Sequence, residues 1–168
     1  VLCLYERYMH LINLQLTSLD EDTNEAFDYY DFLIKQIDYE LQFRFFRLEL
    51  NNIFQKFPKV KKAMEDSIKL KQKQIGFVFN HQIKYGYIKP LSKEELEFVV
   101  SNTWIIVAKW EVYWILDKVD DELQRRKRGI LNFLYFIKPY LTQKGLKETK
   151  LLESIQYLQK GINNENSL

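Results

Sequence analysis

The sequence predicts an all-α fold, a helical bundle of about six to seven helices. Three observations point to it. The segment from Ser92 to Asp117 combines a helix-start signal with apolar residues at helical spacing, and Glu25 to Phe57 is helical by composition, with no glycine or proline. An alternating strand pattern of useful length occurs nowhere in the sequence. With 168 residues, 46% of them hydrophobic, the chain is long enough to form one core and one domain.

The segment from Ser92 to Asp117 is the helix around which the other helices are expected to pack. It starts with a capping box, in which the Ser92 hydroxyl accepts from the Glu95 N–H and the Glu95 carboxylate accepts from the Ser92 N–H. Three apolar stripes run along it, as in a buried helix, a subunit interface or a membrane span. Because Lys109 and Glu111 interrupt the apolar run, a membrane span is disfavoured. One side is expected to face its own subunit and another a partner subunit.

The remaining elements follow from breaks, caps and periodicity. A single helix from Glu25 to Phe57 would be far longer than the usual length of about 11 to 12 residues, so we expect a break near Phe43 to Arg47. Pro58 suits the first turn of the next helix, and Gly86 suits a left-handed cap at its end. The other elements are expected as a helix at Val1–Leu19, a polar connector at Asp20–Asn24, a helix at Pro58–Tyr85, a charged connector at Asp117–Arg128, a helix at Gly129–Leu141 that Pro139 kinks or ends, and a helix at Leu146–Lys160.

Charge and cysteine content limit the classes of partner. The 25 basic and 23 acidic residues nearly balance, so the chain has no overall electrostatic footprint for a polyanion. Cys3 is the only cysteine, which excludes an intramolecular disulfide and fits the reducing cytoplasm, where we expect the protein to be located. No segment has the pattern of a signal peptide, and no association with a membrane is expected.

Catalytic and metal-binding motifs are not found in the sequence, so we expect no enzyme activity, no cofactor and no metal. There is no glycine-rich phosphate loop, no nucleophile elbow and no pair of cysteines. Glu6 and His10 are spaced i,i+4, but the repeated Glu-x-x-His pairs of a di-iron bundle are missing. The basic run from Arg125 to Arg128 follows three acidic residues, so we interpret it as a solvated, self-paired face.

From about Tyr30 onward, a series of motifs occurs in a defined order. An aromatic-rich helix junction leads to a helix that begins after Phe-Pro and is rich in Lys and Gln, and a glycine turn precedes the long helix. The motif residues are Phe45-Phe46-Arg47-Leu48-Glu49-Leu50, Phe57-Pro58, Gly86-Tyr87-Ile88, Ser92 to Leu116, and Ile137-Lys138-Pro139-Tyr140-Leu141-Thr142 with Gly145. In order and spacing this series resembles the ligand-binding region of TetR/AcrR-type transcriptional regulators.

The resemblance implies a fold like the TetR C-terminal domain and a division of the chain into three parts. Residues 1–19 would form a helix that connects the chain to an upstream helix-turn-helix domain, which this sequence lacks. Residues 20–161 would form the ligand-binding and dimerisation domain, and residues 162–168 a disordered tail. Operator DNA would be bound only through the missing N-terminal domain.

The resemblance also implies a set of ligand-binding residues. In the family, effectors bind inside the subunit among the helices that match Glu25–Phe43, Pro58–Tyr85 and Ser92–Asp117, and aromatic walls with few polar groups suit a small apolar or aromatic compound. The expected ligand-binding residues are Phe43, Phe46, Phe77, His81, Asn102 and Trp104. The apolar stripes of Ser92–Asp117 and Gly129–Leu141 are more than one subunit's core can use, so the expected partner is a second copy of the chain. The expected four-helix homodimer interface includes Trp110, Tyr113, Trp114, Phe133, Leu134 and Ile137.

Two interpretations stay open at this point. The first is the effector-binding and dimerisation domain of a TetR-type regulator that controls DNA binding. The second is an all-helical protein–protein interaction or scaffold module without a small-molecule ligand, in which the aromatic residues fill the core and His81 bonds to a backbone carbonyl. A closed internal pocket with a few convergent polar groups would distinguish them.

Overall fold

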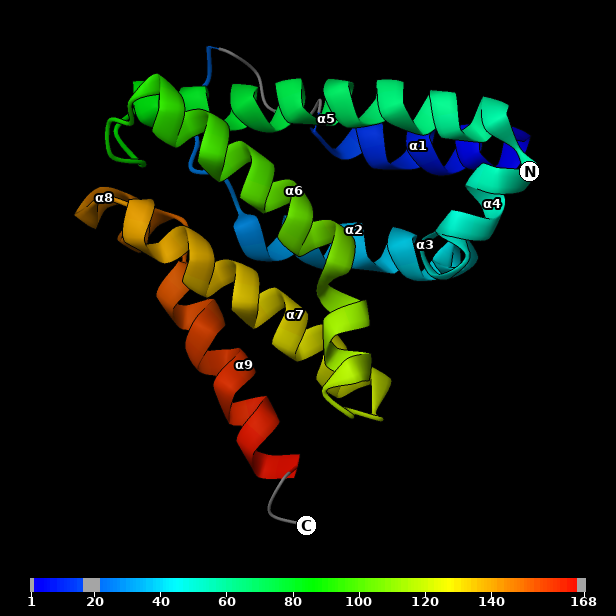
Figure 1. Cartoon of the computed structure of the whole chain (residues 1–168). Coiled ribbons are helices and arrows are strands. Elements are labelled where there is room, and N and C mark those ends of the chain that lie inside the picture. The colour runs from blue at the N-terminus through cyan, green and yellow to red at the C-terminus, as the bar shows by residue number, and fades with distance from the viewer. Residues whose placement is uncertain (1, 17–21, 166–168) are drawn as a thin grey trace.

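Figure 1 shows the computed structural model, which describes residues 2–16 and 22–165; for residues 11–16, 46–47, 50–51 and 163–165 it describes the backbone alone. Within these ranges the regular structure is helical, apart from one isolated bridge between Ile88 and Leu141, so the all-α prediction is confirmed. The elements are α1 (Leu2–Leu16), α2 (Tyr29–Gln42), α3 (Arg44–Leu48), α4 (Leu50–Lys56), α5 (Pro58–Lys84), α6 (Lys93–Leu116), α7 (Glu122–Ile137), the 3-10 helix η1 (Lys138–Tyr140), α8 (Gln143–Glu148) and α9 (Leu151–Glu165).

The helix α6 lies at the centre of the packing. It contacts α5 on one side and α7 on the other, while α1 packs along α5 and α2, and α9 packs against α7 (Figure 1). Two clusters of buried apolar side chains result. The larger one is shared by α2, α5, α6, α7 and α9, and includes Leu33, Phe79, Val99, Leu134 and Leu151. The smaller one lies among α1, α4 and α5, and consists of Tyr5, Met9, Phe43, Ile53 and Val60.

The predicted start of α6 is present in the structure. The Glu95 N–H donates to the Ser92 hydroxyl at 3.1 Å, and the Ser92 N–H donates to the Glu95 carboxylate at 2.7 Å. These two bonds satisfy backbone donors that would otherwise have no partner in the first helical turn. The register of α6 is thereby fixed at its first residue, which determines the side of the helix on which each later residue lies.

The predicted break between the second and third helices and the ends of α5 are also confirmed. The helix α2 ends at Gln42 and α3 begins at Arg44, so Phe43 is the junction residue. Pro58 is the first residue of α5, where its missing N–H costs no helical hydrogen bond. Gly86 has a φ of 75°, the left-handed conformation that a glycine adopts without steric penalty at the end of a helix.

The charged connector predicted at Asp117–Arg128 is wrong in its second half. The helix α7 begins at Glu122, because the Asp121 carboxylate accepts from the Gln124 N–H and caps it. Glu, Gln, Arg and Lys are good helix formers, so a run of charges does not by itself indicate a loop. Arg125 is buried and donates to the backbone carbonyls of Val119 and Asp120, which holds the connector against α7.

The C-terminal helix differs from the prediction at both ends. Instead of one helix at Leu146–Lys160, the chain forms α8 and α9, and Lys150 between them has a positive φ of 54°. The helix α9 continues to Glu165, and Ile162 is buried. Part of the expected tail is therefore helical, and residues 166–168 lie outside the described residues.

Two turns that are far apart in the sequence are joined at one end of α6. The Thr142 N–H donates to the Tyr87 carbonyl and the Lys89 N–H donates to the Tyr140 carbonyl, both at 2.9 Å. Gly145 fits closely here, because a Cβ at this position would lie 2.0 Å from the Tyr87 carbonyl oxygen. The turn after α5 and the turn after α7 are thus one packed unit, and a glycine is required where α8 meets it.

Candidate functional site

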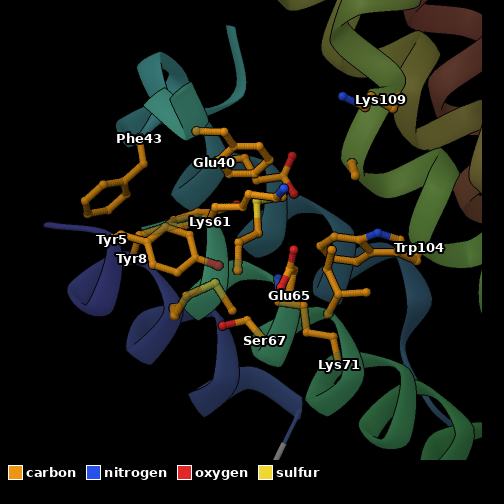
Figure 2. Close-up of a pocket in the computed structure, with 15 residues that line it drawn as sticks. Tyr5, Tyr8, Glu40, Phe43, Lys61, Glu65, Ser67, Lys71, Trp104 and Lys109 are labelled. Atoms are coloured by element: carbon orange, nitrogen blue, oxygen red, sulfur yellow. The ribbon is translucent and has the colours of Figure 1, made fainter. Parts of the chain in front are cut away.

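A cavity of about 310 Å³ lies where α1, α2, α4, α5 and α6 meet (Figure 2). Its volume falls at the lower end of the range of about 300 to 1,000 Å³ that is typical of small-molecule sites. The lining is mainly apolar and aromatic, with a few charged groups. The lining residues are Tyr5, Tyr8, Met9, Glu40, Phe43, Phe54, Lys61, Met64, Glu65, Ser67, Ile68, Lys71, Trp104, Ala108 and Lys109.

Helical spacing brings these side chains to one place. Tyr5, Tyr8 and Met9 lie three and four residues apart on α1, so they share one face of that helix. The six residues that α5 contributes, at positions 61, 64, 65, 67, 68 and 71, are linked by the same spacing of three and four. Trp104 and Ala108 are one turn apart on α6. The cavity is therefore lined mainly by helix faces.

One wall of the cavity is aromatic. The rings of Tyr8 and Phe43 have centroids 5.2 Å apart, and those of Tyr5 and Tyr8 are 6.2 Å apart. Burial raises the pKa of the Tyr5 hydroxyl, and its hydrogen bond with Ser67 acts in the opposite direction with a smaller effect. Tyr5 is therefore neutral at physiological pH. This wall offers apolar ring surface with few polar atoms.

Lys71 is the buried cation of the site. Its side chain comes from the middle of α5, the residue is only 3% exposed, and its Nζ lies 4.9 Å from the ring centroid of Trp104 and 5.9 Å from that of Tyr8. Within the described part of the chain, this ammonium group has these ring contacts but no hydrogen-bond or ion-pair partner. Burial lowers the pKa of Lys71 to about 8, and the charge of Glu40 opposes this shift.

Glu40 connects the cavity to the main core. One of its carboxylate oxygens accepts from Gln36 Nε2 at 3.1 Å, and the other accepts from Trp110 Nε1 at 3.2 Å. Trp110 is a buried residue of α6, and its ring packs directly against Gly129 of α7. A buried carboxylate requires such donors, because an unpaired charge in the interior is strongly unfavourable. The cavity wall on α2 is therefore in contact with both α6 and α7.

An ion pair between the half-buried Arg44 and the buried Glu111 lies beside this connection. Arg44 Nη2 of α3 is 3.0 Å from Glu111 Oε1 of α6, and Arg44 Nη1 is 3.9 Å from the Glu122 carboxylate at the start of α7. The first pair is close, although its atoms are not aligned as a hydrogen bond. The charge of Glu111, which is completely buried, is compensated by this arginine.

The structure brings two of the six predicted ligand residues together. Phe43, at the junction of α2 and α3, and Trp104, on α6, both line the cavity. Phe77 and His81 lie farther along α5 and do not line it. The Nε2 of His81 is 2.8 Å from the Thr23 carbonyl, and its Nδ1 accepts from Gln82 Nε2, so this imidazole fixes the chain segment before α2.

The other two predicted ligand residues do not place a described side chain in the cavity. Asn102 donates to the Phe98 carbonyl within α6 and does not line the cavity. The Phe46 side chain lies outside the described residues. The buried polar residues that line the cavity are Lys71 and Glu40, a position that we expected for His81 and Asn102. Sequence reasoning missed Lys71 because it stands in a run of lysines and glutamines that looks solvated.

The predicted dimer residues need a correction. Leu134 and Ile137 have no exposed surface, and Trp110 and Phe133 are buried as well, so these four side chains belong to the subunit's own core. The reason is that α9 and α2 cover the face of α7 that we expected to be free. Of the predicted six residues, Tyr113 is exposed and Trp114 is partly buried.

A different apolar surface is available on α6. Phe98, Ile105 and Leu116 are all exposed, and their spacing of seven and eleven residues places them in one line along the helix, with Tyr113 beside them. We call these four residues the α6 stripe. It lies opposite the buried face of the helix, which carries Val99, Val100, Thr103, Trp110 and Glu111.

The structure is an all-helical domain with a partly open cavity between its helices. The family profile described as "TetR: Bacterial transcriptional repressor" matches residues 7–149, and the chain belongs to this TetR family of transcription regulators. Among solved structures, a TetR-family transcriptional regulator from Marinobacter aquaeolei VT8 matches with a TM-score of 0.76 and 20% sequence identity, over 92% of this chain and 73% of that chain. This likeness shows the shared fold. The comparison with curated proteins gives no match.

Membership of the TetR family confirms the resemblance to TetR/AcrR-type regulators that the order of the sequence motifs indicated. Among the described residues, none of the helices combines the length and the hydropathy that a bilayer-crossing segment needs.

Proposed function

We propose that this chain is the effector-binding and dimerisation part of a TetR-type regulator, and that a small, mostly apolar molecule binds in the cavity and controls DNA binding by an upstream helix-turn-helix domain. The single observation that carries this proposal is the cavity itself. A cavity of about 310 Å³ with aromatic walls and one buried ammonium group is what an effector site requires, and a scaffold module needs no such space.

The position of α1 supports control of DNA binding by the ligand. In our proposal, residues 1–19 connect this domain to the DNA-binding domain. Tyr5, Tyr8 and Met9 of α1 are walls of the cavity. A ligand that needs these side chains in a particular position favours the arrangement of α1 that provides it, since a ligand shifts a conformational equilibrium through differential contacts. Occupation of the cavity would therefore bias the orientation of the connecting helix.

The α6 stripe supports dimerisation. The four large apolar side chains of the stripe form an exposed surface that is unfavourable in water, and a twofold axis would place the same stripe of a second chain against it. The contacts from Glu40 to Trp110, and from Trp110 to Gly129, connect the cavity wall with α6 and α7. The regulator would act in the cytoplasm as a homodimer, with operator DNA as its second partner.

Thermal melts with a panel of small compounds test the proposal. The panel contains octan-1-ol, octanoate, indole and 1-naphthol, each added to the wild-type chain and to Trp104→Ala. At least one compound is expected to raise the melting temperature of the wild type, and Trp104→Ala is expected to change that shift because Trp104 is a wall of the cavity. If no compound raises the melting temperature of either protein, the effector-binding proposal is wrong.

Trp110→Ala is the matched control for the loss of an indole. Trp110 is almost fully buried in the core, whereas Trp104 is partly buried beside an existing cavity. We expect Trp110→Ala to cost about 3 to 5 kcal/mol of unfolding free energy, and Trp104→Ala to cost much less. Equal losses in the two variants would mean that Trp104 is an ordinary core residue.

A further inference from the structure

Lys71 carries a positive charge into a mainly apolar cavity without a counter-charge in contact. The residue is 3% exposed, and its Nζ faces the rings of Trp104 and Tyr8. Ring faces attract a cation, but they replace only part of its hydration. Within the described residues, no acceptor lies within hydrogen-bond distance of this ammonium group. The cavity therefore contains an unsatisfied donor with a positive charge.

Glu40 is not the acceptor for the Lys71 ammonium group, although its charge is near enough to raise the pKa of Lys71. The two carboxylate oxygens of Glu40 accept from Gln36 and from Trp110, and no ion pair joins Glu40 to Lys71. These donors hold the carboxylate toward the core. A second acceptor, supplied from outside the chain, can approach Lys71 without displacing Glu40 from its partners.

The other charged groups around the cavity leave a small positive balance. Lys61 and Lys109 are exposed at its edge, as is Glu65, so the lining contains three lysines and two carboxylates. The exposed groups are solvated and contribute little to a ligand's binding energy. The buried pair of charges, Glu40 and Lys71, decides the chemistry. Glu40 accepts hydrogen bonds from Gln36 and Trp110, whereas Lys71 has no hydrogen-bond partner among the described residues.

From this geometry we propose that the cavity binds an apolar monocarboxylic acid, whose carboxylate pairs with the Lys71 ammonium and whose hydrocarbon part lies against Tyr8, Phe43 and Trp104. The proposal rests on the proposed function, because it names the chemical class of the effector. An ammonium–carboxylate pair within an apolar site is stronger than the same pair in water, and the hydrocarbon part removes the aromatic walls from water.

The cavity volume sets the size of the acid. A water molecule occupies about 30 Å³ in the liquid, so a cavity of about 310 Å³ holds roughly ten atoms of that size. Octanoate, with eight carbon and two oxygen atoms, fits this limit. Octan-1-ol has the same chain without the charge, and octylamine has the opposite charge, so these three compounds separate the contribution of the headgroup from that of the chain.

Isothermal titration calorimetry at pH 7 with the 168-residue chain tests the proposal. Octanoate is expected to bind the wild type at least ten times more tightly than octan-1-ol, and octylamine is expected to bind least. Lys71→Met removes the charge and leaves an unbranched apolar side chain that is one atom shorter. In this variant octanoate is expected to lose at least tenfold in affinity, while octan-1-ol still binds. Lys61→Met removes an exposed lysine of the same cavity and is expected to keep the wild-type preference.

Two results would overturn the inference in different ways. If octan-1-ol binds the wild type as tightly as octanoate, or if Lys71→Met keeps its affinity for octanoate, the cavity binds apolar molecules but Lys71 does not select an acid. If none of the three compounds binds the wild type or Lys71→Met, and the compounds of the thermal panel also fail, the proposed function is wrong as well. Thermal melts of Lys71→Met, which are expected to show a folded protein of higher stability, exclude unfolding as the cause of lost binding.

Discussion

Gly129 of α7 lies against the face of the Trp110 ring of α6, so closely that a Cβ on the glycine would be 2.7 Å from Trp110 Cε3. The ring has little freedom to move away, because Trp110 Nε1 donates to Glu40. We expect Gly129→Ala to lower the free energy of unfolding by about 1 to 3 kcal/mol through overpacking, even though alanine is the better helix former. Urea denaturation followed by circular dichroism measures the change.

Gly76 of α5 is the matched control for this substitution. The nearest atom to a Cβ at this position is Val100 Cγ2 at 3.9 Å, which is an ordinary van der Waals distance. Gly76→Ala is therefore expected to raise the free energy of unfolding by about 0.5 to 1 kcal/mol. The close approach of α6 and α7 would be disproved if both variants were more stable than the wild type.

Tyr29 has a buried hydroxyl that makes no hydrogen bond in the described part of the chain. Burial raises the pKa of this hydroxyl, which therefore stays neutral, but the group still loses its hydration. Tyr29→Phe keeps the ring contacts with Phe27 and Phe133 and removes the hydroxyl. We expect the variant to be more stable than the wild type by about 1 kcal/mol.

Tyr87 is the control for the removal of a tyrosine hydroxyl. It is also buried, but its hydroxyl is 3.2 Å from the Asn24 carbonyl and 3.1 Å from the Asn24 side-chain oxygen. Tyr87→Phe is expected to lower stability by about 0.5 to 1.5 kcal/mol, because it removes a hydrogen bond. A loss of stability in Tyr29→Phe of the same size would show that its hydroxyl has a partner.

Lys71 makes the stability of the protein depend on pH in a defined window. Its pKa is lowered from 10.5 to about 8 by burial in the folded state. Between these two values the unfolded chain holds a proton that the folded chain has released, so the free energy of unfolding rises with pH across this window. Below about pH 8 the charged amine destabilises the folded state, by at most on the order of 3 kcal/mol.

A comparison of the wild type with Lys71→Met isolates the contribution of Lys71 to the pH dependence of stability. The other titratable groups that line the cavity are common to both proteins; they are Tyr5, Tyr8, Glu40, Lys61, Glu65 and Lys109. We expect Lys71→Met to be the more stable protein at pH 7, and the difference to shrink as the pH rises from 8 to 10. Urea denaturation at several pH values measures it. A difference that does not change with pH would contradict the burial of the charged amine.

Ile105 lies in the middle of the α6 stripe and is 55% exposed in the single chain. If the stripe is the dimer contact, Ile105→Asp places a charge in the centre of an apolar interface and is expected to produce a monomer. Light scattering at micromolar concentration gives the mass. Tyr157→Asp, at an exposed aromatic position of α9, is the control and is expected to leave the dimer intact. A dimeric mass for Ile105→Asp would place the contact elsewhere.

Local signals in the sequence predicted the elements that local chemistry determines. The capping box at Ser92, the proline at the start of α5, the glycine at its end and the break at Phe43 all depend on residues near them in the chain. The start of α7 was missed because the acid cap at Asp121 was read as part of a charged connector. At each of these positions, residues that are close in the sequence are sufficient to explain where the helix begins or ends.

Residues that depend on distant neighbours could not be assigned in the same way. A helix with apolar residues on three sides does not reveal which side its own subunit covers, and so Trp110 was expected at a dimer interface although α2 and α7 bury it. Lys71 has the same local sequence context as the exposed lysines beside it. Its burial results from Tyr8 and Trp104, which α1 and α6 bring to α5 from far along the chain.

If α6 tilts, the joined turns at its beginning would be the fixed end of that motion. Hydrogen bonds from Thr142 and Lys89, together with the close fit of Gly145, tie this end to two other helices. With 24 residues, α6 is about 36 Å long, so a tilt of about 5° at the fixed end would move its far end by about 3 Å. Trp104 lies nearly halfway along α6. A tilt that displaces the helix at the cavity would therefore displace Leu116, at its far end, about twice as far.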